Sequence, residues 1–204
     1  MESRQTRFAH RISIALIPPT IAAAAFAVLV LAYEHGSIFH RIVVWIVATL
    51  CAGGLQMLYV LSLRRRAEVT AYDVPERRQR TKPYAVSAGL SLAGVLMLLY
   101  MNASVFVWGL MWCFFINTLI LGLINLRWKI SAHMMGFTGP VVFLFPLVGW
   151  TLLILLPLAI LLGWARITLR AHTLPQVLAG AAAGLALTLV QARVILALLL
   201  PMMQ

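Results

Sequence analysis

Acidic residues are scarce in this chain, and they are missing from most of its length. The 204 residues include five Asp and Glu against sixteen Lys and Arg, and no acidic residue occurs in 77–204. Membrane enzymes that hold Mg²⁺ between facing helices need clustered carboxylates, because hard cations prefer oxygen ligands. Prenyl-transfer and alcohol-phosphotransfer enzymes that depend on such a magnesium site are therefore excluded.

Charge of either sign and cysteine are also rare. Charged residues make up 10% of the sequence, hydrophobic residues make up 63%, and the mean hydropathy is +0.97. A soluble domain needs far more polar surface, so we expect an all-α integral membrane protein with a bundle of six to seven transmembrane helices. Cys51 and Cys113 lie in apolar runs without the spacing of a metal clip or redox pair, so a structural disulfide is not expected.

The net charge of +11 is spread along the chain. The basic residues flank hydrophobic segments and do not form one soluble basic face, so nucleic acid is not an expected partner. Membrane lipids with anionic head groups are the expected partners instead.

Hydrophobic length marks the expected spans, since a helix rising about 1.5 Å per residue needs roughly 20 residues to cross the hydrocarbon core. We expect a single membrane domain over 1–204, in which 1–63 form an N-terminal helical hairpin. The first span is expected to be an anchor, because its apolar core is too long for a signal peptide. The spans are Ile12–Tyr33, Ile42–Leu63, Ala85–Met101, Val105–Leu126, Met134–Trp150, Thr151–Trp164 and Thr173–Leu200.

The segment Met134–Trp164 has two interpretations. It is too long for one straight span and short for two, and it contains several prolines and Gly149. As a hairpin that turns near 146–151, it returns the chain to its starting side. As one kinked span, it places 127–133 and 166–172 on opposite faces. A site that uses residues from both stretches can therefore form only under the hairpin interpretation.

Under the hairpin interpretation, three polar clusters share one side of the membrane. They are Arg64–Tyr84, Arg127–His133 and Arg166–His172. Counting Arg4, Arg7 and Arg11 as well, fourteen of the sixteen Lys and Arg residues lie on that side, and only Arg41 and Arg193 do not. The positive-inside rule makes the shared side cytoplasmic. We therefore expect a multipass protein of the bacterial inner membrane with these clusters facing the cytoplasm.

Two stretches within these clusters combine histidine with arginine or serine at defined spacing. "ARITLRAHTLPQ" contains Arg166, His172 six residues later, and then Gln176, while "ISAH" contains Ser131 and His133. They resemble two motifs of the type-2 phosphatidic acid phosphatase superfamily, S-R-x5-H-x3-D and P-S-G-H. Gln176 stands at the position of the family's Asp.

The remaining motif of this family, K-x6-R-P, is matched less closely. The dipeptide "KP" that begins at Lys82 resembles the R-P pair, whereas Pro75 stands at the position of the Lys. Arg77, Arg78 or Arg80 could supply the missing charge from a shifted backbone. The resemblance covers about 73–184.

The resemblance implies metal-independent hydrolysis of a lipid phosphate or diphosphate, isoprenoid or glycerophospholipid, through a phosphohistidine and without a cofactor. His172 would be the nucleophile, His133 the general acid, and Arg166 a clamp on the phosphate. Phosphoryl transfer mainly needs positive donors around the equatorial oxygens. The other candidate phosphate-binding residues are Arg77, Arg80, Lys82, Lys129 and Ser131.

Gln176 puts catalysis in question. The family's Asp orients the nucleophilic imidazole and stabilises its charge, whereas a Gln carbonyl can accept the same hydrogen bond but carries no charge. Asp73 and Glu76 are candidates for a replacement carboxylate, and their alternative role is pairing with neighbouring arginines. Two other functions remain open: an impaired relative that binds or transports a lipid phosphate, and an unrelated multipass membrane subunit.

The beginning of the last span has its own signals. Thr173 is a favoured N-cap, so the helix should begin just after His172, with its N–H groups directed at the phosphate. Gln176, Gly180 and Gly184 recur every four residues and share one face. The small residues predict close approach of a second helix there.

Overall fold

The computed structural model describes residues 3–69, 74 and 76–199, and the regular elements within them are all helical. The helices in chain order are α1 (Arg4–Ala15), α2 (Pro18–Tyr33), α3 (Ile38–Thr49), the π-helical turn η1 (Leu50–Gly54), α4 (Leu55–Arg65), the 3-10 turn η2 (Arg78–Arg80), α5 (Thr81–Tyr100), α6 (Val105–Asn125), α7 (Ala132–Val148), the 3-10 segment η3 (Gly149–Leu155), α8 (Leu156–Thr168) and α9 (Leu174–Leu199).

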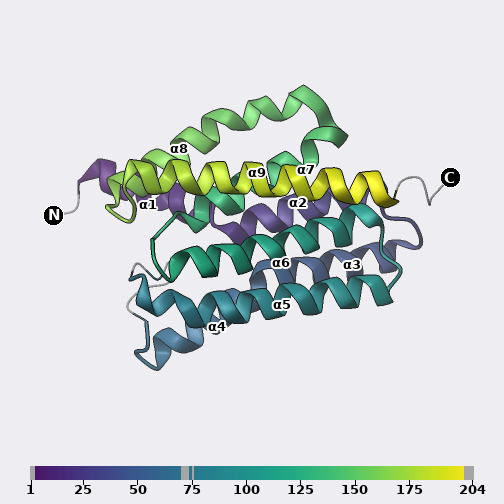
Figure 1. Cartoon of the computed structure of the whole chain (residues 1–204), viewed down its shortest axis with the longest axis horizontal. Coiled ribbons are helices and arrows are strands. Elements are labelled where there is room, and N and C mark those ends of the chain that lie inside the picture. The colour runs from purple at the N-terminus through teal and green to yellow at the C-terminus, as the bar shows by residue number, and fades with distance from the viewer. Residues whose placement is uncertain (1–2, 70–73, 75, 200–204) are drawn as a thin grey trace.

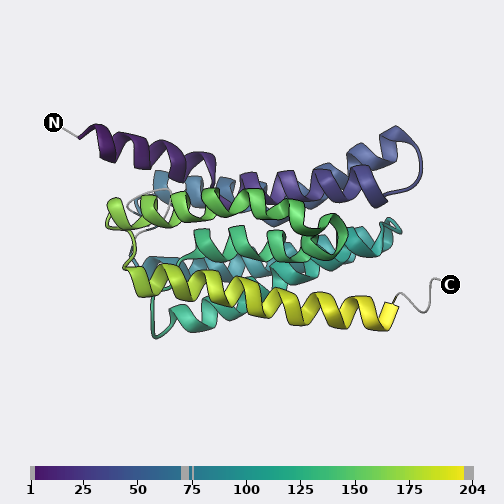
Figure 2. The same ribbon diagram turned by 90° about the horizontal axis from the view of Figure 1, so that it is seen from above.

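The helices form one bundle with roughly parallel axes (Figures 1 and 2). Five helical segments of the described chain are long and apolar enough to cross a membrane, and the bent pair of α1 and α2 gives a sixth if it is counted as one span. The longest segment, Ala132–Thr168, contains α7, η3 and α8. The all-helical architecture and the several apolar helices agree with a multipass membrane protein.

The first expected span, Ile12–Tyr33, is wrong as one continuous helix. α1 and α2 meet at 43°. Pro18 and Pro19 lack the N–H that would continue the helical ladder, and a residue before proline is disfavoured in the helical region. Ile17 is accordingly extended, with φ −66° and ψ 150°. α2 enters the bundle, whereas α1 packs against α8.

The segment after α6 forms a hairpin, as one of the two interpretations predicts. Gly149 has a φ of 77°, a left-handed conformation that favours glycine, and it ends α7. The chain then turns through η3, and α8 runs back beside α7 (Figure 1). The two helices are close: a Cβ added to Gly163 of α8 would lie 3.8 Å from the Met134 sulfur of α7. Residues 127–133 and 166–172 consequently lie at the same end of the bundle.

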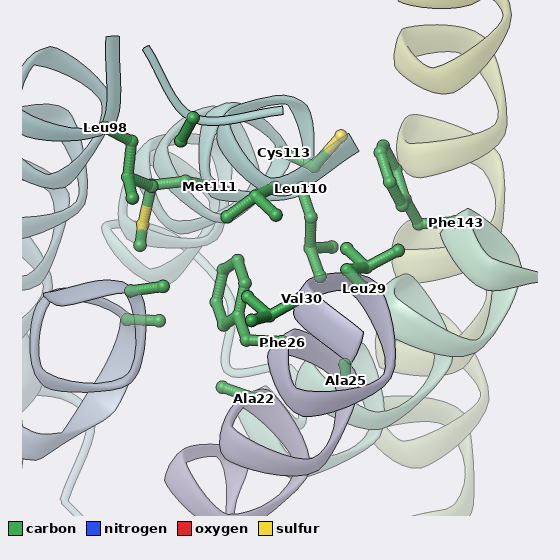
Figure 3. Packing of buried hydrophobic residues seen from close by; sticks show 14 of the residues in the cluster. Ala22, Ala25, Phe26, Leu29, Val30, Leu98, Leu110, Met111, Cys113 and Phe143 are labelled. Carbon is green, nitrogen blue, oxygen red and sulfur yellow. The ribbon is translucent and has the colours of Figure 1, made fainter. Parts of the chain in front are cut away.

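The largest apolar cluster lies where α2 passes between its neighbours (Figure 3). Phe26 and Leu29 of α2 meet Leu110 of α6 and Phe143 of α7, while Leu98 comes from α5. Between helices in lipid, such contacts stabilise mainly through close van der Waals packing. This cluster fixes the relative positions of the helices whose ends carry the polar residues.

Candidate functional site

The turn between α8 and α9 explains the spacing of Arg166 and His172. Arg170 is left-handed, with φ 51°, and its N–H donates to the Ile167 carbonyl at 2.8 Å. The N–H of Ala171 donates to the Arg166 carbonyl at 3.1 Å, which completes a Schellman motif. The N–H of His172 reaches the same carbonyl at 3.2 Å. The helix end thus folds back on itself and holds the two motif residues together.

Gln176 selects the tautomer of His172. Its Oε1 lies 3.3 Å from His172 Nδ1 and also accepts a hydrogen bond from the Thr173 N–H at 3.2 Å. An oxygen that accepts from a backbone N–H faces the ring, so Nδ1 carries the proton and Nε2 keeps its lone pair. Gln176 can therefore orient the imidazole as the resemblance implies for Asp, without contributing charge.

Two helices begin at the site and run in the same direction. Ser131 is the N-cap of α7, and its Oγ accepts from the Met134 N–H at 3.4 Å. His133 lies in the first turn of the same helix, and its buried Nε2 has no hydrogen-bond partner among the described residues. The Ser131 N–H donates to the carbonyl of Gln176, in the first turn of α9, at 3.1 Å. The positive ends of two helix dipoles therefore converge here.

Small residues on α9 allow this convergence. A Cβ on Gly180 would overlap the Ser131 carbonyl oxygen, and one on Gly184 would overlap the Thr138 hydroxyl and the Met135 carbonyl of α7. The predicted close approach of a second helix to this face is confirmed, and the second helix is α7.

Two arginines and two histidines at this end of the bundle are buried. Exposure is 1% for Arg166, 4% for Arg80, 5% for His172 and 9% for His133. Burial, followed by the charges of Arg80, Arg166 and Lys129, lowers the pKa of His172 to about 3. His172 is therefore neutral at physiological pH. We call Arg80, Arg166, His133 and His172 the basic cluster.

Arg80 belongs to this cluster through η2, which precedes α5. Its Nε donates to the Val74 carbonyl at 2.6 Å, and its Nη1 lies 3.5 Å from the Ile130 carbonyl, next to the N-cap of α7. The Tyr84 phenol, one turn along α5, also interacts with Arg80. The stretch that resembles the first motif thus contributes Arg80 as its buried cation.

Arg77 and Lys82 have other partners. Arg77 donates through Nη1 to the Asn125 carbonyl at 2.9 Å and to the Leu126 carbonyl, which caps the C-terminus of α6. Lys82 is mostly exposed and forms an ion pair with Glu68 at 3.0 Å. Neither is among the charges that act on His172, whereas Lys129 is. The structure therefore groups Arg80 and Lys129, but not Arg77 or Lys82, with the histidines.

The described carboxylates bond elsewhere. Glu68 pairs with Lys82, and Glu76 accepts from Gln79 at 3.0 Å on the surface. Glu34 accepts from the Ser104 N–H at 2.9 Å, at the other end of the bundle. Asp73, the other candidate for a replacement carboxylate, lies outside the described residues.

A cavity of about 100 Å³ lies inside the bundle next to the basic cluster. Tyr84, the partner of Arg80, and Ala132, the neighbour of His133, line one part of it. Asn117 and Thr188, joined by a 2.8 Å hydrogen bond, line another. Most of its wall is apolar, with Cys113, Phe114, Leu121, Met135 and Pro140 among the lining residues.

Two residues of this region are not found by motif reasoning. Ser13 of α1 accepts a hydrogen bond from Arg166 Nη1 at 2.7 Å. Tyr84 lies two positions beyond Lys82 and connects Arg80 to the cavity wall. Nothing in the sequence around Ser13 points to a site 153 residues away; the position of Tyr84 beside the KP dipeptide is a signal that could have been used.

Comparisons of the chain with models of known families, with characterised proteins and with solved structures returned no match.

Proposed function

We propose that this protein hydrolyses a lipid phosphate or diphosphate without a metal, through a phosphohistidine, as a divergent relative of the type-2 phosphatidic acid phosphatases. One observation carries the proposal. Two buried arginines and two buried histidines meet the N-termini of α7 and α9, while the described carboxylates bond elsewhere. Buried guanidinium groups and helix N-termini that point to one place favour the binding of an anion there.

The proposed reaction uses the two imidazoles in sequence. Nε2 of neutral His172 attacks phosphorus, and the bond from phosphorus to the lipid oxygen breaks. His133, which takes up a proton when the phosphate anion binds beside it, transfers that proton to the departing oxygen, and Arg80 and Arg166 stabilise the equatorial charge. Water then attacks the phosphohistidine, with His133 accepting its proton, and orthophosphate is released. The free Nε2 of His133 and the lone pair on His172 Nε2 support these roles.

The lipid chain would lie in the bundle and the surrounding bilayer. The cavity beside Tyr84 and Ala132 begins where the phosphate would bind, and its mainly apolar wall suits a hydrocarbon chain. Its volume of about 100 Å³ holds only part of a hydrocarbon chain, so the rest of the chain would lie in the bilayer.

Phosphate release from purified protein in detergent with chelator tests the proposal. The substrates are single-chain and two-chain lipid phosphates and diphosphates. We expect chelator-resistant release that falls by a factor of about 10³ or more in His172→Ala and His133→Ala. His10→Ala is the control, because His10 is exposed on α1. Absence of release from every substrate by folded protein would refute the hydrolase.

A second function is favoured by Gln176 itself. Without a carboxylate to stabilise the imidazolium, the same site could bind or move a lipid phosphate without cleaving it. Gln176→Glu keeps the side-chain length and adds the charge, and Gln176→Asp restores the family's residue. A large gain in turnover in either variant supports a site built for catalysis. If both variants still show no turnover but retain lipid-phosphate binding, the result supports the binding protein.

A further inference from the structure

Arg166 is the largest fully buried side chain in the described part of the chain, and a residue far away in sequence helps to hold it. Its Nη1 donates to Ser13 Oγ at 2.7 Å. Ser13 itself is 4% exposed, so this hydrogen bond is shielded from solvent. Shielded hydrogen bonds to a charged group are among the stronger ones in proteins.

Ser13 reaches Arg166 because α1 leaves the line of α2. The 43° bend before Pro18 lays α1 along α8 rather than extending α2 outward. Ala9 and Ser13, one turn apart, are the buried residues of α1, while Phe8 meets Trp164 with ring centroids 6.0 Å apart. This packing directs the Ser13 hydroxyl at the end of α8 where Arg166 lies.

A hydroxyl is chemically suited to this position. A carboxylate would hold the guanidinium equally well, but it would neutralise the positive charge and compete with a phosphate. A serine oxygen accepts one N–H of Arg166 and adds no negative charge of its own.

We propose that Ser13 is a positioning residue of the phosphate site, which orients Arg166 without neutralising it, and that α1 is therefore part of the site. This inference rests on the proposed function only in assigning phosphate as the ligand. It extends the site from about 73–184, where the motif resemblance lies, to the first helix of the chain.

The test compares Ser13→Ala, Ser13→Thr and Ser13→Asp with the unchanged protein. Ser62→Ala is the matched control, because the Ser62 hydroxyl bonds the Tyr59 carbonyl of its own helix. Two readouts are used: kcat and KM for lipid phosphate, and thermal stabilisation by orthophosphate. The second readout needs no turnover, so the inference can fail or hold independently of the hydrolase proposal.

We expect Ser13→Ala to weaken orthophosphate binding and raise KM on the order of tenfold, with a smaller change in kcat. Ser13→Thr, which keeps the hydroxyl, should restore both, and Ser13→Asp should abolish orthophosphate binding by pairing with Arg166. Orthophosphate binding that is equal in Ser13→Ala and the unchanged protein would overturn the inference. So would a defect that Ser13→Thr does not rescue, because that would indicate a packing role alone.

Discussion

The backbone N–H of Ser131 donates a 3.1 Å hydrogen bond to the carbonyl of Gln176. This single bond joins the first turns of α7 and α9, and it brings the stretches that contain His133 and His172 together. The two imidazoles influence one another electrostatically as a result. The site is thus a product of how two parallel helices are aligned.

Gly180 should be essential to that alignment. A Cβ at this position would overlap the Ser131 carbonyl oxygen, which is backbone and cannot rotate away. We expect Gly180→Ala to separate the two helix ends, to destabilise the fold by roughly 1–3 kcal/mol and to abolish phosphate release. The measurements are thermal unfolding in detergent and turnover.

The control for this change is Gly89→Ala on α5, where an added Cβ meets nothing within 4 Å. It should leave both quantities unchanged. A Gly180→Ala protein with full activity would show that the close contact is not needed.

Arg80 and Lys82 should differ sharply in their importance. Arg80 is buried beside the histidines, so Arg80→Ala should lower kcat/KM by about 10²-fold or more, as for loss of a charge-stabilising donor. Lys82 forms an exposed ion pair, which contributes little, so Lys82→Ala should change kcat/KM by no more than about threefold. Steady-state kinetics on both variants decides. A larger loss of kcat/KM in Lys82→Ala than in Arg80→Ala would contradict this expectation. It would mean that Lys82 binds the phosphate, as the sequence motif suggests, and that Arg80 does not.

Stability should fall in acid because of His172. Its pKa is about 3 in the folded protein, as a result of burial and the neighbouring cations, against about 6.5 for an unperturbed histidine. Below pH 6.5 the unfolded chain binds a proton that the folded protein does not. The contribution of His172 to stability is therefore nil above pH 6.5 and increasingly unfavourable as the pH falls toward 3, by up to about 1.4 kcal/mol per pH unit.

Melting temperatures from pH 7.5 to 4.5 check this expectation. The His172→Gln variant should lose less stability over that range than the unchanged protein, since it lacks the titrating group. Saturating orthophosphate should also reduce the loss, because a bound anion raises the pKa of His172. Parallel curves for variant and unchanged protein would contradict the assignment.

The cavity should determine which lipid chains are accepted. Ser87 is buried and lines it, so Ser87→Leu should fill part of the volume. We expect turnover of long single-chain phosphates to fall about tenfold, while a short-chain phosphate that does not reach the cavity keeps its rate. Gly89→Leu adds a similar side chain to an open position of the same helix and should change neither rate. Equal loss on both substrates would place the effect on folding instead.

Much of the architecture could be predicted because it depends on local patterns. Apolar length predicts the membrane-crossing helices, and the signals around Thr173 and Gly180 predict where α9 begins and which face packs closely. The break at Pro18 was missed as a helix boundary, although the two prolines are a local signal for it. The choice between hairpin and kinked span could not be made locally, because it depends on how Gly149 and η3 pack against the rest of the bundle.

The sequence by itself determined the apolar helices, the lack of acidic residues beyond position 76, and the six-residue spacing from Arg166 to His172, because each is a property of adjacent residues. Only the tertiary structure decided which cations face the histidines. Arg80 and Lys82 are neighbours in the motif, yet two helical steps turn side chains to nearly opposite sides, so one is buried and the other pairs with Glu68 at the surface. Ser13 likewise reaches Arg166 only because α1 bends back onto α8. Contacts of this kind depend on helix rotation and docking, which distant parts of the chain determine together.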